Sequence, residues 1–129
     1  MLSLRAVLRH LLVIATVLAV AVAACSSQPE TCDEIADETI VLMQTLIDDV
    51  EREFGEVSAE ELIDRMFAGE ELPSVTAFEE QAATLSERAG ELGCTQDQLE
   101  EAVAGRTDQL IATTELGEFI IKAIKSGGL

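Results

Sequence analysis

The stretch TCDEIADETIVLMQTLIDDVEREFG, residues 31–55, decides the fold because it has the pattern of one long amphipathic helix. Thr31 can cap this helix, and Glu34, three residues later, completes a capping box. Apolar residues then recur at alternating steps of four and three, which is the spacing of one helix face. The seam consists of Ala36, Ile40, Met43, Ile47, Val50 and Phe54, widened by Ile35, Leu42 and Leu46. We expect Gly55 to end the helix in the left-handed conformation that glycine tolerates.

Two more helices are predicted after this one. The first is short and spans residues 58–69, from a serine cap to a glycine stop. The second spans residues 76–93, with a candidate capping box at Thr76 and Glu79 and with Pro73 in the loop before it. Its apolar seam is Val75, Phe78, Ala82, Leu85, Ala89 and Leu92. The two alanines of this seam would let another helix approach closely.

The last part of the chain predicts one or two helices. Thr95 and Gln98 form a capping box at the start of a fourth helix. The pattern beyond it fits either one long bent helix or a break near residues 113–117. Since no segment after residue 30 has the alternating pattern of a strand, we expect an all-α fold. The seams are too short to demand a coiled coil and fit a small bundle of four to five helices.

The N-terminal segment has the features of an export signal. Residues 1–10 are short and basic, and residues 11–24 form an uncharged apolar run of 14 residues. A membrane-spanning helix needs about 20 such residues, whereas 14 suit the apolar region of a signal peptide that is removed.

The run ends in Val22, Ala23, Ala24 and Cys25, which resembles the lipobox of bacterial lipoproteins. The resemblance implies cleavage before Cys25 and a diacylglyceryl group on its sulfur. It therefore implies attachment to the outer face of the cell membrane, or to an outer membrane if there is one. An ordinary signal peptide that leaves a free Cys25 is the alternative.

These features divide the chain into four parts. A signal peptide covers residues 1–24, and a polar tether that carries the lipid covers residues 25–30. The helical domain covers residues 31–125, and residues 126–129 form a tail that we expect to fray.

The other two cysteines have positions that favour a disulfide. Cys32 opens the first predicted helix, and Cys94 directly follows the third. If these helices pack antiparallel, the two thiols meet, and an exported protein can keep the bond. Redox or metal chemistry is the alternative, but the sequence has no C-x-x-C motif and no histidine after His10.

The charge of the chain limits its partners. All 25 acidic residues lie after Cys25, where they face only six Lys and Arg, so this part has a side-chain charge of −19. Nucleic acid is excluded as a partner because phosphate binding needs clustered cations. A cationic protein would be attracted. The simpler interpretation is a well-solvated surface.

The residue types that most catalytic and metal sites use are missing. The sequence after residue 24 has no His, Tyr, Trp or Asn, so a Ser-His-Asp or Cys-His arrangement is impossible there. No loop of the EF-hand type gathers the carboxylates for calcium. We therefore expect no enzyme, no metal site and no cofactor other than the lipid on Cys25.

One apolar run stands out near the C-terminus. Phe119, Ile120, Ile121 and Ile124 lie within seven residues, which is nearly too apolar for a one-sided helix. These side chains are either buried in the bundle or form a candidate interaction surface for a partner helix, a second copy or an apolar ligand.

The sequence as a whole predicts a non-catalytic binding or scaffold module of the bacterial cell envelope. The large negative charge raises a first alternative, an immunity or inhibitor protein against a basic toxin or hydrolase. A carrier that holds an apolar ligand such as a lipid between its helices is the second alternative. The sequence leaves the oligomeric state open.

Overall fold

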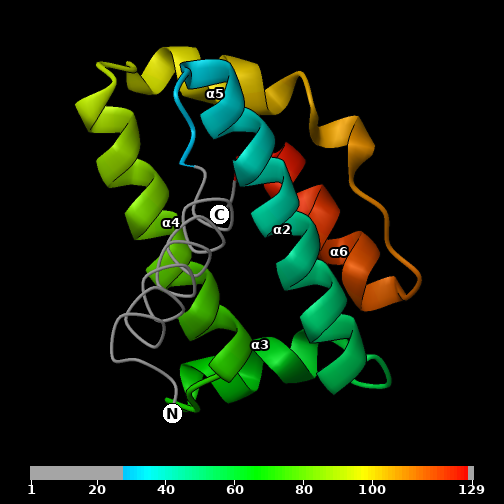
Figure 1. The fold of residues 1–129 in the computed structure, drawn as a ribbon. Helices are drawn as coiled ribbons and strands as arrows, with labels where there is room; N and C mark the ends of the chain where they lie inside the picture. Colours follow the sequence, from blue (N-terminus) through cyan, green and yellow to red (C-terminus); the bar gives the residue numbers. More distant parts are fainter. Residues whose placement is uncertain (1–27, 128–129) are drawn as a thin grey trace, which may run out of the picture.

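The computed structural model describes residues 28–127, which form five α-helices, one short 3-10 helix and no strand (Figure 1). The elements are α2 (Cys32–Phe54), α3 (Ala59–Phe67), α4 (Pro73–Glu91), α5 (Gln96–Ala104), η1 (Thr107–Gln109) and α6 (Glu115–Lys125). The predicted all-α bundle is therefore confirmed. The predicted signal peptide and Cys25 lie outside the described residues. None of the described helices is both long and apolar enough to cross a membrane.

Helix α2 is the centre of the bundle. It packs against α4, α5 and α6, while α5 lies across one end of the bundle and α3 across the other (Figure 1). The predicted capping box is present, since the Thr31 side chain accepts from the Glu34 N–H and the Glu34 carboxylate accepts from the Thr31 N–H. Because neighbours surround α2, its buried set is wider than one seam. It comprises Ile35, Ala36, Ile40, Leu42, Leu46, Ile47 and Val50.

The end of α2 differs from the prediction. Gly55 has φ −58° and ψ −22°, a right-handed conformation that any residue can adopt. The left-handed stop predicted there is therefore wrong. Glycine is instead required by close approach, because a Cβ on Gly55 would overlap the carbonyl oxygen of Glu51.

The start of α4 also differs from the prediction. The helix begins at Pro73, three residues before the predicted cap, and the Leu72 N-cap has no side-chain hydrogen bond. Proline suits the first helical position because its φ is preset and its missing N–H has no partner to lose there. Thr76 therefore lies inside the helix, where its hydroxyl donates to the Leu72 carbonyl at 3.3 Å.

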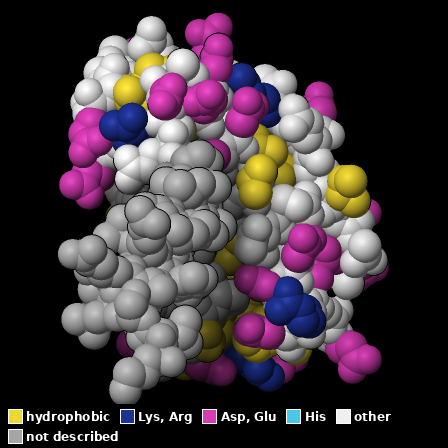
Figure 2. Space-filling view, viewed as in Figure 1, with side chains coloured by type: hydrophobic (Ala, Val, Ile, Leu, Met, Phe, Trp, Pro, Cys, Tyr) yellow, Lys and Arg dark blue, Asp and Glu magenta, His cyan; other side chains and the backbone are white. Residues whose placement is uncertain are grey.

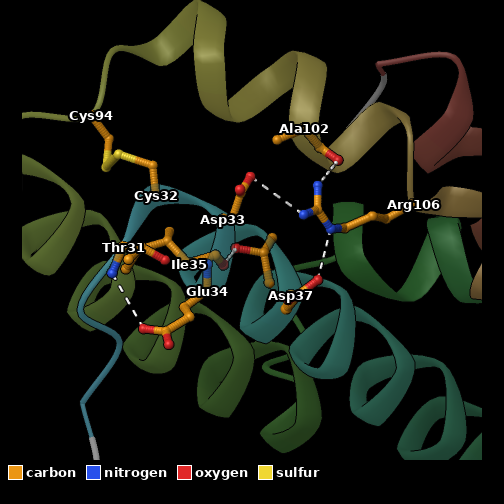
Figure 3. Close-up of polar contacts among 10 residues, drawn as sticks. Thr31, Cys32, Asp33, Glu34, Ile35, Asp37, Cys94, Ala102 and Arg106 are labelled. Carbon is orange, nitrogen blue, oxygen red and sulfur yellow. Dashed lines mark hydrogen bonds and ion pairs between the residues drawn. A yellow bond between two sulfur atoms is a disulfide. The ribbon is translucent and has the colours of Figure 1, made fainter.

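The end of α4 places Cys94 against α2. Gly93 has φ +73°, and the Cys94 N–H donates to the Ala89 carbonyl at 3.0 Å. The Gly93 N–H donates to the Gly90 carbonyl at 3.1 Å, which completes a Schellman motif. The turn brings the Cys94 sulfur to Cys32 at the start of α2, and the predicted disulfide is present with a sequence separation of 62 (Figure 3).

The core has two clusters of buried side chains. One lies at the α3 end of the bundle and contains Leu46, Val50, Leu62, Leu72 and Leu116. The other lies between α2 and the C-terminal third of the chain and contains Ile40, Ile47 and Leu110. Ile120 of α6 packs against both clusters and so joins them.

The chain between α5 and α6 is broken rather than one long helix. Helix α5 ends at Ala104, and α6 begins at Glu115 with Thr114 as its N-cap.

Two polar side chains of α2 hold the extended segment between η1 and α6. The Gln44 amide pairs with both backbone groups of Ile111, each at 2.9 Å. Since Gln44 and Glu51 are two helical turns apart, they act from the same side of α2.

Glu51 is the second of these polar side chains. Its carboxylate accepts from the Thr113 N–H at 2.8 Å and from the Thr113 hydroxyl at 2.9 Å. Burial raises the pKa of Glu51, but hydrogen bonding from Thr114 and Thr113 outweighs it and holds the pKa below its usual range. Gly117 leaves room for the carboxylate, since a Cβ there would lie 2.7 Å from its carbon atom. The carboxylate also faces the positive end of the α6 dipole.

Candidate ligand cavity

A cavity of about 600 Å³ lies between α2, α4 and α5 and reaches the end of α6. Most of its lining side chains are apolar. They are Ile35, Leu42, Met43, Phe78, Ala82, Leu85, Ala89, Leu99, Val103, Ala104 and Ile124. The polar lining consists of Thr39, Ser86, Glu100, Thr107 and Lys125, with Gly127 at the end of the described chain.

The α2 wall of the cavity comes from one helix face. Ile35, Thr39, Leu42 and Met43 occupy positions i, i+4, i+7 and i+8, which lie above one another on a helix. The Thr39 hydroxyl donates to the Ile35 carbonyl at 2.7 Å, so its polar atom is satisfied within α2. This wall therefore presents mainly methyl and methylene groups.

The α4 wall explains why the cavity exists. The predicted seam of α4 faces α2, but Val75, Phe78, Ala82 and Leu85 are only half-buried. The seam predicts that Ala82 and Ala89 let another helix approach closely. Ala89, near the disulfide, is buried, whereas the small side chain of Ala82 is only half-buried and leaves open the volume that a larger side chain would fill.

The rim has few charged groups. Glu100 of α5 and Lys125 of α6 are the charged residues in the described lining. The Lys125 ammonium donates to the Asp108 carboxylate at 3.0 Å, and both side chains reach solvent. Lys125 is thus the cationic group at the described rim that can approach the anionic head of an amphipathic ligand.

The α5 end of the cavity is fixed by covalent and ionic contacts (Figure 3). The disulfide joins the start of α2 to the end of α4. The Arg106 guanidinium donates to the Asp37 carboxylate at 2.7 Å and to the Ala102 carbonyl at 2.8 Å, and it lies 3.5 Å from Asp33. The hydrogen bond to Asp37 raises the pKa of Arg106. Arg106 follows α5 and thus links the end of α5 to α2.

The cavity lining supplies mainly apolar contacts. Its described walls offer no cysteine, histidine or pair of carboxylates to an enclosed substrate. Within residues 28–127, no group of three His, Cys, Asp or Glu side chains is placed to hold a metal ion. A chain of methylene groups would gain roughly 25 cal/mol for each Å² of apolar surface removed from water.

The predicted site residues have different positions in the structure. Cys32 and Cys94 are joined, and Cys25 lies outside the described residues. Phe119 is 45% exposed, whereas Ile120, Ile121 and Ile124 are half-buried against the core. Ile124 alone of these four lines the cavity.

The sequence raises a carrier with an apolar ligand between its helices as an alternative, but it does not give the position of the cavity, because a seam of large and small residues has the same pattern whether or not its small residues leave space open. Ala82 and Ala89, seven residues apart on one face, predict close packing, and the same two residues line the cavity.

The remaining described surface is strongly acidic. Asp and Glu side chains are spread over the visible described face, and Lys and Arg are fewer (Figure 2).

No protein-family model, curated protein or solved structure matches the chain.

Proposed function

We propose that the protein is a lipid-anchored, non-catalytic binding module of the bacterial cell envelope, and that its cavity holds one apolar ligand such as an acyl chain. The observation that carries this proposal is the cavity of about 600 Å³ with largely apolar walls. Sites for small molecules commonly have volumes of about 300–1,000 Å³ and are lined mainly by apolar side chains. Lys125 at the rim supplies one polar contact that would orient a carboxylate or phosphate head.

The N-terminal pattern supports the anchored part of the proposal. A basic start, an apolar run and the residues Val22–Cys25 follow one another as in lipoproteins. Two acyl chains hold a protein stably on a bilayer, whereas one does not. Residues 25–30 would span at most about 20 Å, so the domain would stay close to a source of acyl chains.

The ligand proposal is tested by filling the cavity. Ala82→Phe adds a ring to the α4 wall, and Ala83→Phe adds the same ring at the next residue, which is exposed. The probe is cis-parinaric acid, a fatty acid whose fluorescence rises in an apolar site. We expect binding by the native protein and by Ala83→Phe, and a loss of at least about tenfold in Ala82→Phe.

The opposite results would refute a ligand site. These are the absence of a fluorescence change with the native protein, or equal binding by Ala82→Phe and Ala83→Phe. Lipid extracts of protein purified without harsh detergent provide a second measurement, since an occupied cavity releases one identifiable apolar species on mass spectrometry.

The anchor is tested separately. Cys25→Ser removes the sulfur that would carry the lipid, so we expect an unprocessed chain without the added lipid mass. An unchanged mass and unchanged membrane association would contradict the lipoprotein proposal and leave the cavity proposal intact.

A further inference from the structure

Helix α3 has more apolar surface than the bundle covers. At about 100° per residue, its apolar side chains extend over an arc of about 140°. The arc runs from Leu62 through Met66 and Ile63 to Phe67. Leu62 is buried in the core, but Ile63 is 36%, Met66 48% and Phe67 86% exposed. We call Ile63, Met66 and Phe67 the α3 patch.

The α3 patch differs from the other exposed apolar residues. Val41, Ile111 and Phe119 are single exposed side chains on separate elements. Isolated exposures of this kind are normal, whereas three on one short helix face form a contiguous apolar surface. A helix of nine residues gains little stability by itself and depends on packing against the rest of the bundle. The buried Leu62 supplies such packing, whereas the exposed face of the helix contributes little to it.

The edge of the patch is acidic. Glu60 and Asp64 follow Phe67 around the helix, and Glu70 and Glu71 come after the helix end; all four side chains are exposed. Arg65 is on the other side, where it pairs with Glu61 at 3.0 Å. An apolar centre with a polar edge is the usual anatomy of a protein interface.

The position of the patch bears on its partner. The described chain begins at residue 28, shortly before α2. The Pro29 carbonyl accepts from Arg88 at 2.8 Å, late in α4, and the end of α4 is joined to the start of α2 by the disulfide. Residue 28 is therefore at that end of the bundle. Helix α3 follows the end of α2, whose 23 residues span about 35 Å. The patch is therefore at the opposite end of the bundle from residues 28–30, with which the described chain begins (Figure 1). An anchored chain would present it away from its own membrane.

We propose that the α3 patch docks a basic amphipathic helix of a partner protein. The apolar face of such a helix would cover Phe67, Met66 and Ile63, and its Lys and Arg residues would face the acidic edge. A second copy of the chain is disfavoured because its own acidic edge would be brought against this one. Anionic headgroups would be repelled for the same reason.

The test measures binding of a labelled leucine–lysine peptide whose leucines form one helix face. The full chain is held in nanodiscs of zwitterionic lipid, and empty nanodiscs give the blank. Phe67→Ser should weaken binding about tenfold, because Phe67 is the aromatic residue of the patch and its most exposed side chain. Ile111→Ser is the matched control, since Ile111 is also mostly exposed, at 68%, but lies outside the patch. Its binding should stay within about twofold of the native value.

A second peptide separates shape from charge. It has the same composition, but its leucines are spread around the helix, so we expect much weaker binding to the native chain. For the amphipathic peptide, raising the salt from about 0.1 to 1 M shortens the Debye length from roughly 10 to 3 Å and should weaken binding.

Three results would overturn the proposal. One is equal binding by Phe67→Ser and the native chain, and another is equal binding of the two peptides. The third is a concentration-dependent dimer of the native chain that Phe67→Ser abolishes, because the occupant would then be a second copy. Circular dichroism of both variants confirms that these comparisons concern folded protein.

Discussion

The two sides of α2 are packed in different ways. Toward α6, Ile47 is fully buried, and Gln44 and Glu51 hold the extended segment between η1 and α6 by hydrogen bonds. Toward α4, half-buried side chains of α4 such as Phe78, Ala82 and Leu85 line a cavity of about 600 Å³. We call these the closed side and the open side. One helix can thus contribute to a packed core on one side and form one wall of a cavity on the other.

The two sides also differ in what fixes them. The closed side depends on side-chain packing and polar contacts distributed along α2. The open side is joined at its α5 end by the bond between Cys32 and Cys94. The covalent link thus holds α2 and α4 together at one end of the cavity, while the middle of α4 lines the cavity.

Of the changes considered, loss of the disulfide should lower the free energy of unfolding most, and it should affect the open side more than the closed side. Replacing both Cys32 and Cys94 by alanine removes a crosslink across a sequence separation of 62. The chain-entropy model gives a loss of about 4 kcal/mol in the free energy of unfolding. Urea denaturation measures the loss, and hydrogen exchange locates it.

We expect exchange to increase mainly in α4 and less in α6, since the bond holds the open side. Equal increases in both helices would mean that the two sides unfold as one unit and would remove the distinction.

A pair of core truncations compares the sides directly. Ile47→Ala on the closed side removes a side chain with 0% exposure, and we expect a loss of about 3 kcal/mol. Leu85→Ala on the open side shortens a half-buried side chain at the cavity wall, where fewer neighbours are lost. Its cost should be at most about 1 kcal/mol.

Urea titrations of the two variants test this, and equal losses would show that the cavity walls are as well packed as the core. Added fatty acid should stabilise the native chain and have a weaker effect on Leu85→Ala, because the ligand contacts that wall.

Local signals in the sequence were sufficient for most of the helices. The boxes at Thr31 and Thr95 and the Gly93 stop are where the sequence predicts them, because caps depend on residues within one turn. The position of Cys94 follows from that stop, and so the disulfide was predictable. Thr76 was misleading because a threonine inside a helix has the same sequence pattern as a cap, and Pro73 begins the helix earlier.

Relations across the chain were not predictable. Gln44 binds Ile111 and Glu51 binds Thr113, each across more than 60 residues. In the sequence, both are ordinary polar residues beside an apolar seam. The cavity volume was not predictable for the same reason, since it depends on how α4 and α2, which are separate in the sequence, pack together. The exposed α3 patch was also missed, because apolar residues in a short helix suggest a core.

The last and smallest effect concerns the polar contacts of the closed side. Glu51→Gln removes the negative charge that faces the start of α6, and the amide in its place would keep only part of the hydrogen bonding to Thr113. The folded pKa of Glu51 is below its usual range, so the carboxylate contributes stability above about pH 4, where it is also ionised in the unfolded chain. This contribution is lost as the pH falls through the folded pKa.

The melting temperature of Glu51→Gln should therefore be below that of the native chain at pH 7, and the difference should shrink as the pH falls below about 4. Gln44→Glu is a matched variant on the same side of α2, because it keeps an acceptor for the Ile111 N–H but loses the donor to the Ile111 carbonyl and to the Asp48 carboxylate. Its deficit should persist at neutral pH and become smaller in acid, where a protonated carboxyl can donate again. A Glu51→Gln deficit that stays constant from about pH 7 to about pH 3 would show that the carboxylate charge does not hold α6, and that packing and uncharged hydrogen bonds close this side of the bundle.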